Sequence, residues 1–457
     1  MGQLLIRADG GPGVGAGHLA RCLALAESWI DAGGSASLFS DSLPDWWRGV
    51  YTASAVDVRG AADLESSVGE WVVLDGYQFG VDEQLRTRSN GARLLVIDDH
   101  GAVGAYRCDA VLDQHLLAVA SCYADRLPET ELLLGSRFAL LRRGFATHRE
   151  AARTYDRERP VLLVATGGSP TPDFEELVAA VVALLPSLEI RRLDGIVDVA
   201  AAMGEADLAL TAAGSVCWEL ACSGVPAVLL PVAANQEPIA SALDAAGAGM
   251  SLGAEKWPAA ERVADAVRSL AGDPERRRAM SERGRALVDG RGAARVTAHL
   301  RSHLLQLRDA SPDDCRLVWD WANDPITRAA GVAKEPIPWD DHVRWFEAKL
   351  LDPRCRIYLA RDAQGEPVGQ VRFDARGEDA EIGVAVAASQ RGRRWGPAII
   401  LAGVRRMFAE LSGVNRVTAR ILPDNARSIR AFGDAGFTFE AVDQTTGLVQ
   451  HTRQRSD

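Results

Sequence analysis

The chain has 457 residues, of which 47% are hydrophobic and 25% are charged, as in an ordinary soluble globular protein. A single hydrophobic core does not grow to this size, so two or three domains are expected. The net charge of −11 excludes a general attraction to nucleic acid or to acidic membranes, so any phosphate site must be local.

The first third of the chain, residues 1–147, alternates short apolar segments with helical patterns. This alternation predicts a Rossmann-like domain built on a parallel sheet. A helix is expected from about residue 17 to residue 32. The first apolar segment leads directly into Arg7 and Asp9, which favours a strand over a signal peptide. The expected strands are Leu4–Ala8, Ser37–Phe39, Val72–Leu74, Leu94–Ile97 and Ala110–Leu112.

A charged segment poor in aliphatic residues, 146–159, predicts a linker to a second Rossmann-like domain over residues 148–303. Its expected strands and helices alternate in the same way. Ligands bind at the carboxyl ends of the strands in such folds, so the two domains are expected to share a cleft. The expected elements are the strands Val161–Val164, Leu208–Leu210 and Ala227–Leu230 and the helices 259–271 and 274–288.

The pattern changes in residues 304–457, where two helical stretches precede a group of strands. This order predicts a separate α+β domain of about 150 residues, a size that folds alone. The expected helices are 312–322, 338–349, 397–410 and 425–435, and the expected strands are Ile357–Arg361, Val368–Phe373, Glu381–Val386 and Arg416–Ile421.

A glycine-rich turn follows the first expected strand and includes Gly15 and Gly17. Glycine lets the backbone approach a ligand closely, and the free N–H groups of the helix that follows suit an anion. His18 begins this helix. The helix N-terminus is expected to lower its pKa and so to favour the neutral form of a general base. The alternative is a histidine that only caps the helix or shapes the loop.

The second domain offers two further turns of the phosphate-binding kind. Gly167 and Gly168 follow its first strand, and Gly214 and Ser215 open a helix after a later strand, where backbone N–H groups and a hydroxyl can meet a diphosphate. Glu219 lies about one turn further along the same face, so its carboxylate can accept two hydrogen bonds from a ribose diol. Alternatively, Glu219 is a solvated helix residue.

Asn235 and Gln236 follow the strand at 227–230. Their amide groups suit sugar hydroxyls or a water molecule, or they cap the next helix. Trp218 is equally well explained as a core residue.

Taken together, these segments resemble the UDP-sugar hydrolase of pseudaminic acid biosynthesis over about residues 3–303. No single motif is specific, but the set is. The matching segments are Ile6–Asp9, Gly15–Leu23, Leu74–Tyr77, Ile97–Asp99, Leu112–Gln114, Leu134–Gly135, Leu141–Arg142, Gly214–Glu219, Asn235–Gln236 and Asp289–Gly292.

The resemblance implies a GT-B-like pair of Rossmann-like domains that transfers a sugar to water in place of a sugar acceptor. It implies removal of UDP from a 2,4-diacetamido-2,4,6-trideoxy sugar, with inversion at the anomeric carbon and without a metal. By this resemblance His18 activates the water, Tyr77 and Asn235 lie near the sugar, and Glu219 holds the ribose. Asp98 and Asp99 are expected to orient loops.

Three positions depart from this family's pattern. His115 stands where the family usually has Asn, Gly144 where an acidic residue is common, and Ala20 where Met is usual. These departures concern the identity of the sugar more than the chemistry.

In the last domain, the segment Gln390–Ala398 follows a strand and opens a helix. Backbone N–H groups there can bind a pyrophosphate, and its arginines add local positive charge. A loop with Asn425, a helix and a Gly-Phe turn then fit the second half of a coenzyme A site.

This region resembles the GNAT N-acetyltransferases over about residues 305–445, and its opening Trp319–Pro325 with His342 and Trp345–Phe346 resembles the sugar-amine acetyltransferase of the same pathway. The resemblance implies attack of a neutral amine on the acetyl thioester. The residues implied to bind acetyl-CoA are Arg391, Gly392, Arg393, Gly396 and Asn425.

The same region departs from the GNAT pattern. Arg394 occupies the usual first glycine position, Pro397 lacks one backbone donor, and Phe432 replaces the Tyr that protonates the thiolate in many members. Glu381 is the expected base. The alternative is a degenerate acetyltransferase fold that serves as a binding or dimerisation module.

The sequence thus predicts a bifunctional enzyme with a UDP-activated amino-sugar and acetyl-CoA as substrates, and without metal, nucleic acid or membrane partners. Seven scattered cysteines without a C-x-x-C motif favour a reducing cytoplasm. The alternatives are a UDP-sugar-dependent glycosyltransferase with a fused acetyltransferase and a UDP-sugar-binding protein without turnover.

Overall fold

In the computed structural model, the chain forms two compact units. The larger unit holds residues 3–30 and 35–293, and the smaller unit holds residues 31–34 and the chain from Ala294 onward, together with Gly2. The structure describes residues 2–11, 16–150, 153–166, 172–193, 198–253 and 257–455.

The first sheet of the larger unit has seven parallel strands in the order β3-β2-β1-β4-β5-β6-β7. Because all strands run the same way, their carboxyl ends meet at one edge. The predicted parallel sheet is confirmed, with two further strands, β3 and β7. The strands are β1 (Gln3–Ala8), β2 (Ser35–Phe39), β3 (Asp57–Arg59), β4 (Trp71–Asp75), β5 (Arg93–Ile97), β6 (Ala110–Asp113) and β7 (Glu131–Leu134).

Among the described residues, the helices α1 to α3 accompany this sheet, whereas α4 packs through Phe145 against Ala200 and Met203 of the following part. The first, α1, begins directly after the glycine-rich turn, as predicted. It buries the apolar side chains of Leu19, Leu23 and Trp29. The helices are α1 (Gly17–Asp31), α2 (Asp45–Ala53), α3 (Val81–Arg88) and α4 (Arg143–His148).

The second sheet has five parallel strands in the order β12-β11-β10-β8-β9. Neighbouring residues of a strand face opposite sides, and both sides are covered: Leu162 lies in one apolar cluster and Leu163 in another. Strands buried on both faces appear as continuous apolar runs, which is why they were predictable. The strands are β8 (Val161–Ala165), β9 (Glu189–Arg192), β10 (Leu208–Ala212), β11 (Ala227–Leu230) and β12 (Met250–Ser251).

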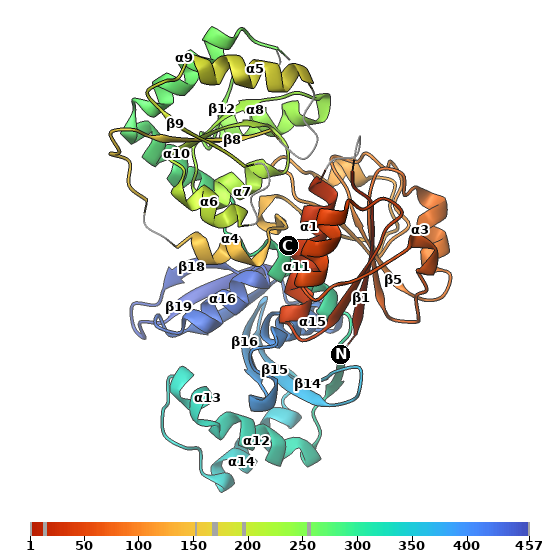
Figure 1. Ribbon diagram of the computed structural model, residues 1–457. Coiled ribbons are helices and arrows are strands. Elements are labelled where there is room, and N and C mark those ends of the chain that lie inside the picture. Colours follow the sequence, from red (N-terminus) through yellow and green to blue (C-terminus); the bar gives the residue numbers. More distant parts are fainter. Residues whose placement is uncertain are drawn as a thin grey trace. The chain divides into compact units, whose positions relative to one another are not determined.

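The helices of this part lie on both sides of the sheet, with α5 and α9 on one side and α6 and α7 on the other (Figure 1). The Rossmann-like character predicted for both parallel sheets is confirmed. The helices are α5 (Pro172–Ala183), α6 (Val199–Glu205), α7 (Val216–Ser223), α8 (Glu237–Ala245), α9 (Ala260–Ala271) and α10 (Pro274–Leu287).

The smaller unit is built on a mixed sheet in the order β13-β14-β15-β16-β17-β19-β18, antiparallel except for the β16–β17 pair. The predicted α+β domain is confirmed. The strands are β13 (Gln306–Asp309), β14 (Cys355–Arg361), β15 (Pro367–Arg376), β16 (Asp379–Val386), β17 (Arg416–Ile421), β18 (Thr438–Val442) and β19 (Val449–Gln454).

Two helix groups cover opposite faces of this sheet. Ile399 and Val404 of α15 pack with Val371, whereas Val318 of α12 and Phe346 of α14 pack with other strand residues, and α12 to α14 lie together in Figure 1. The helices are α11 (Gly292–Ser302), α12 (Cys315–Asn323), α13 (Pro325–Ala330), α14 (Trp339–Leu351), α15 (Trp395–Glu410) and α16 (Ala426–Asp434).

From Ala294 onward, α11 belongs to the smaller unit, so that unit begins before the expected boundary at residue 304. The three-domain division stays a prediction. Within the described residues, no helix is both long and apolar enough to cross a membrane.

Candidate active sites

The first candidate site lies at the carboxyl edge of the first sheet. There β1 and β4 are neighbours, with Ala8 paired to Asp75, and α1 begins at Gly17 shortly after β1 ends. This topology brings His18 to Asp75, with 2.6 Å between the imidazole Nδ1 and the carboxylate Oδ1. Both side chains are buried.

The charge on Asp75 fixes the tautomer of His18. Burial raises the pKa of Asp75, but the charges and hydrogen bonds of Arg21 and His18 outweigh it, and the pKa is lowered overall. An ionised carboxylate only accepts hydrogen bonds, so Nδ1 of His18 carries the proton that it donates. In the neutral form of the imidazole, Nε2 is then the nitrogen with the lone pair, as a general base requires.

Arg21 ties Asp75 to a second carboxylate, Asp99. Its guanidinium donates to Asp75 at 2.7 and 2.8 Å and to Asp99 at 2.7 Å. The hydroxyl of Tyr77 donates to the other oxygen of Asp99 at 2.7 Å, and its ring lies edge-on to the His18 ring with centroids 5.4 Å apart. His18 and Tyr77 thus share one hydrogen-bonded network.

Asp75 and Arg21 are parts of this network that were not predicted from the sequence. Asp98 does orient a loop, because it accepts hydrogen bonds from the backbone of Gly101 and Ala102. Asp99 instead faces Arg21 and Tyr77. The sequence feature that could have indicated these contacts is the position of Asp99 after a buried strand, at the same sheet edge as Asp75.

Residues of the second half reach this network within the larger unit. Asn235 lies near the Tyr77 hydroxyl, where its side chain opposes the rise in the pKa of that hydroxyl, and a Cβ added to Gly17 would lie 3.2 Å from the hydroxyl oxygen of Ser215. The structure therefore brings His18, Tyr77, Asn235 and Ser215 together, and their roles in a site stay predictions. Three further predicted residues, Gly15, Gly167 and Gly168, lie outside the described residues.

Glu219 lies on α7, one turn after Ser215, and is only partly exposed. Burial raises the pKa of its carboxyl to about 7, and the positive charge of Arg142 opposes that rise. The alternative of a fully solvated helix residue is therefore wrong. A desolvated carboxyl beside a phosphate-type turn is well placed to change its protonation when a ligand binds.

We expect Glu219→Gln to weaken UDP binding at pH 8 by about 1.5–3 kcal/mol, because a charged acceptor is lost. The ratio of the wild-type UDP affinity to that of the variant should rise about tenfold between pH 6 and pH 8. The reason is that a carboxyl with a pKa of about 7 ionises over this range. Calorimetric titration across this range checks both, and the variant controls for ionisation of UDP itself. Parallel pH profiles would contradict a ribose-binding carboxylate.

Gln236 and Trp218 complete this region. The Gln236 side chain does not cap α8; its Oε1 accepts a hydrogen bond from the backbone of Val232 at 3.0 Å. Its Nε2 lies 3.9 Å from where a Cβ on Gly214 would be, so it remains beside the glycine turn. Trp218 is 1% exposed and belongs to the apolar core, the alternative that the sequence analysis left open.

The second candidate site lies in the smaller unit, where the segment after β16 opens α15. Gly392 has a φ of +80° and Arg394 a φ of +57°, the left-handed region that glycine tolerates best. The Arg391 side chain is held by Asp324 and by the Thr327 hydroxyl. Gly396 lies in the first turn of α15.

Arg301 of α11 stabilises this turn through two contacts. It donates to the backbone carbonyl of Arg393 at 2.7 Å and lies over the Trp395 ring, 3.7 Å from its centroid. Burial, followed by the charges of Arg393 and Arg394, lowers the pKa of Arg301 to about 10. Several positive groups thus converge on the start of α15, an arrangement that suits an anion.

We expect Arg394→Gly to be more stable than Arg394→Ala by about 1 kcal/mol, because only the alanine keeps a Cβ in the left-handed region. Both variants lose the same side chain and its 3.8 Å contact with Asp31, so the comparison isolates the backbone. Thermal unfolding of the two variants is the measurement. Equal stabilities would show that the turn relaxes in the alanine variant.

The other predicted residues of this site lie around the β16–β17 pair. These strands pair only from Asp379–Glu381 to Arg416–Thr418, although both continue further. Asn425 caps α16 by accepting from the Ser428 backbone and donates to the Ala330 carbonyl at 3.2 Å. Glu381 is part-exposed and lies 3.6 Å from Arg420.

Phe432, at the position of the tyrosine expected in many GNAT members, is buried against the Phe437 ring, with centroids 5.0 Å apart. It carries no acidic proton. The structure brings Arg391, Gly392, Arg393 and Gly396 to one turn, and Phe432 supplies no general acid.

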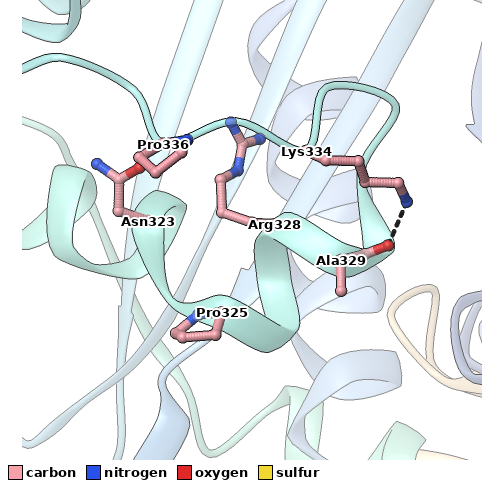
Figure 2. A pocket seen from close by; sticks show the side chains of 6 residues that line it. All are labelled: Asn323, Pro325, Arg328, Ala329, Lys334 and Pro336. Carbon is pink, nitrogen blue, oxygen red and sulfur yellow. Dashed lines mark hydrogen bonds between the residues drawn. The ribbon is translucent and has the colours of Figure 1, made fainter.

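A pocket of about 390 Å³ opens beside α13 (Figure 2). Two of the lining side chains, Arg328 and Lys334, are cationic, and most of the others are apolar. None of the residues predicted for the acetyl-CoA site lines it, but Arg391 and Asn425 hold the same helix from outside. Its lining residues are Asn323, Pro325, Arg328, Ala329, Lys334 and Pro336.

Comparison with known proteins agrees with this two-part description. Residues 305–438 match the model of the acetyltransferase (GNAT) domain. The chain is 27% identical over 192 residues to the UDP-2,4-diacetamido-2,4,6-trideoxy-beta-L-altropyranose hydrolase of Campylobacter jejuni. The aligned region covers 41% of this chain and 67% of that protein.

Two further similarities are more limited. A spore coat polysaccharide biosynthesis protein of Bacillus subtilis is 33% identical over 104 residues, covering 23% of this chain and 31% of that protein. The solved structure of a spermidine N-acetyltransferase from Vibrio cholerae is 16% identical with a TM-score of 0.31, and covers 34% of this chain and 96% of that one. The N-terminal part of the chain therefore resembles a UDP-diacetamido-sugar hydrolase, and it is fused to a GNAT acetyltransferase domain.

Proposed function

We propose that the larger unit hydrolyses a UDP-2,4-diacetamido-2,4,6-trideoxyhexose and that the smaller unit acetylates the 4-amino group of a UDP-amino-sugar, in nonulosonic acid biosynthesis of the pseudaminic type. The similarities above support the coarser statement of a bifunctional enzyme related to nucleotide sugars. The observation that carries the hydrolytic half is the His18–Asp75 pair, 2.6 Å apart, beside Ser215 and Asn235.

In the proposed hydrolysis, Nε2 of His18 takes a proton from water as the water oxygen attacks the anomeric carbon. The bond from that carbon to the UDP oxygen breaks on the opposite face, so the configuration inverts. Asp75 stabilises the imidazolium that forms. Gly214 and Ser215, with Gly167 and Gly168, are proposed to hold the diphosphate, Glu219 the ribose, and Tyr77, Asn235 and Gln236 the sugar.

Incubation with the UDP-sugar alone separates hydrolysis from its alternatives. Hydrolysis yields UDP and free sugar without any acceptor, and NMR of the first product gives its anomeric configuration. Release of UDP only after a sugar acceptor is added would identify a glycosyltransferase. Tight UDP binding without any product would identify a binding protein.

In the proposed acetyl transfer, the neutral 4-amine attacks the thioester carbonyl, the carbon–sulfur bond breaks, and the amine proton passes to Glu381 while coenzyme A leaves. Arg391, Gly392, Arg393 and Gly396 are proposed to bind the pyrophosphate, and Asn425 a further part of the coenzyme. Beyond Glu381, the side of β16 that faces β17 is not paired with that strand, and its backbone groups are proposed to bind the amide-bearing arm of the coenzyme. The pocket with Arg328 and Lys334 suits an acceptor that carries a diphosphate.

Mass spectrometry of products from a panel of UDP-4-amino-sugars, with and without acetyl-CoA, tests the second half. A mass increase of one acetyl group that requires acetyl-CoA supports it. The His18→Asn variant is the matched control, because it should still acetylate. Absence of acetylation on every sugar would favour the degenerate, non-catalytic module.

A further inference from the structure

A second polar cluster lies at the carboxyl edge of the first sheet, apart from His18. It consists of His100, Asp113 and His115, which follow or end the neighbouring parallel strands β5 and β6. Each residue offers one ligand atom, and the three atoms all lie within 4.8 Å of one another. Neither proposed reaction uses these side chains.

The backbone and ring of His100 are held in an unusual way. Its φ is +59°, a left-handed conformation that costs energy in a residue with a side chain. The ring faces that of His115, with centroids 4.2 Å apart and planes at 32°. Its Nε2 is buried and makes no hydrogen bond to any described residue, which is costly for a polar atom.

Asp113 is rigidly positioned between the two histidines. It is fully buried and accepts hydrogen bonds from the Tyr123 hydroxyl at 2.7 Å and from the His100 backbone at 3.2 Å. Its other oxygen lies 2.6 Å from Nδ1 of His115. Outer hydrogen bonds of this kind orient a carboxylate that binds a metal.

We propose that His100, Asp113 and His115 bind one divalent transition-metal ion. Two imidazoles and one carboxylate select zinc, cobalt or nickel over magnesium and calcium, which prefer oxygen ligands alone. A tetrahedral ion with bonds of about 2.0–2.2 Å needs ligand atoms about 3.3–3.6 Å apart. The three ligand atoms, which lie within 4.8 Å of one another, reach this spacing after shifts of about 1 Å.

The proposed role of the ion is structural, because it would stabilise the loops after β5 and β6 by binding residues of both. It also reaches the hydrolytic network, because Nδ1 of His115 lies 3.6 Å from Asp99, and Asp99 accepts from Arg21 and Tyr77. The ion takes no part in the proposed hydrolysis, so either proposal can be wrong while the other is right.

Titration of the full chain with Co²⁺, followed by its visible absorption, tests the site. The wild type is expected to bind one equivalent more than His100→Asn or His115→Asn, with the bands of four- or five-coordinate cobalt. His148→Asn is the matched control, since His148 lies on α4, 4.0 Å from Asp198, and this variant should bind as the wild type does. Equal uptake by all four proteins, or none by the wild type, overturns the proposal.

A second measurement covers the case in which a variant fails to fold. Crystals of the wild type soaked in zinc should show an anomalous scattering peak among the three side chains at the zinc edge. A map with no peak there overturns the proposal, whether or not the protein hydrolyses a UDP-sugar.

Discussion

His18→Asn is expected to lower hydrolytic turnover by about 10²–10⁴-fold, the usual contribution of a general base, while UDP still binds. The asparagine amide can donate to Asp75 as Nδ1 of His18 does at 2.6 Å, but it has no basic nitrogen to accept the water proton. The rate of UDP release from the UDP-sugar and the affinity for UDP, measured by calorimetry, are the two readouts.

A matched control for this variant is His148→Asn, which makes the same chemical change on α4. It should hydrolyse at the wild-type rate. Wild-type turnover in His18→Asn would remove His18 from the mechanism. A loss of UDP affinity equal to the loss of turnover would instead assign His18 to nucleotide binding.

Asp75→Asn is expected to reduce turnover by about 10²–10³-fold, because the neutral amide no longer fixes the tautomer of His18 or stabilises the imidazolium. It should also destabilise the larger unit. Arg21 loses an ionic partner in the protein interior, which costs about 3–5 kcal/mol when no other partner remains. The loss should be smaller here because Asp99 still accepts from Arg21 at 2.7 Å.

The pH dependence of this stability loss has a defined sign. Because the pKa of Asp75 is lowered in the folded protein, its contribution is fully present above the unfolded value of about 3.9. It is lost as the pH falls through the folded value, so wild type and variant should converge in acid. Urea unfolding at several pH values measures this.

Cys22→Ala is the control for Asp75→Asn, since it removes only the thiol that donates to Asp75 at 3.3 Å and keeps both arginine contacts. Its turnover should stay within a few-fold of the wild type. Full activity in Asp75→Asn would show that His18 is held by its surroundings alone.

The sequence predicted the central strands of the two parallel sheets because their apolar runs are buried on both sides. Strands at or near the sheet edges were missed. β9 (Glu189–Arg192) has three charged residues among its four, and β12 spans only Met250–Ser251, so neither carries a continuous apolar signal. Such strands are defined by pairing with a neighbour, which a local pattern does not reveal.

The candidate hydrolytic site was predicted in part for a similar reason. His18, Tyr77 and Asn235 were predicted from local segments that are specific only when taken as a set. The roles of Asp75 and Arg21 depend on β4 lying next to β1, and sheet order is a long-range property that spacing along the chain does not encode. The Asp99–Tyr77 contact joins the ends of two different strands and was hidden in the same way.

The turn before α15 is braced by Arg301, a residue that precedes the matched GNAT segment 305–438. Arg301 also donates to the backbone carbonyl of Ala32 at 2.6 Å, near the beginning of the chain. The acetyltransferase unit therefore draws on two stretches of polypeptide, and a gene fragment starting at codon 304 would encode a protein without this brace. Engineers who wish to express or exchange this half should keep α11 whole and supply the 31–34 segment.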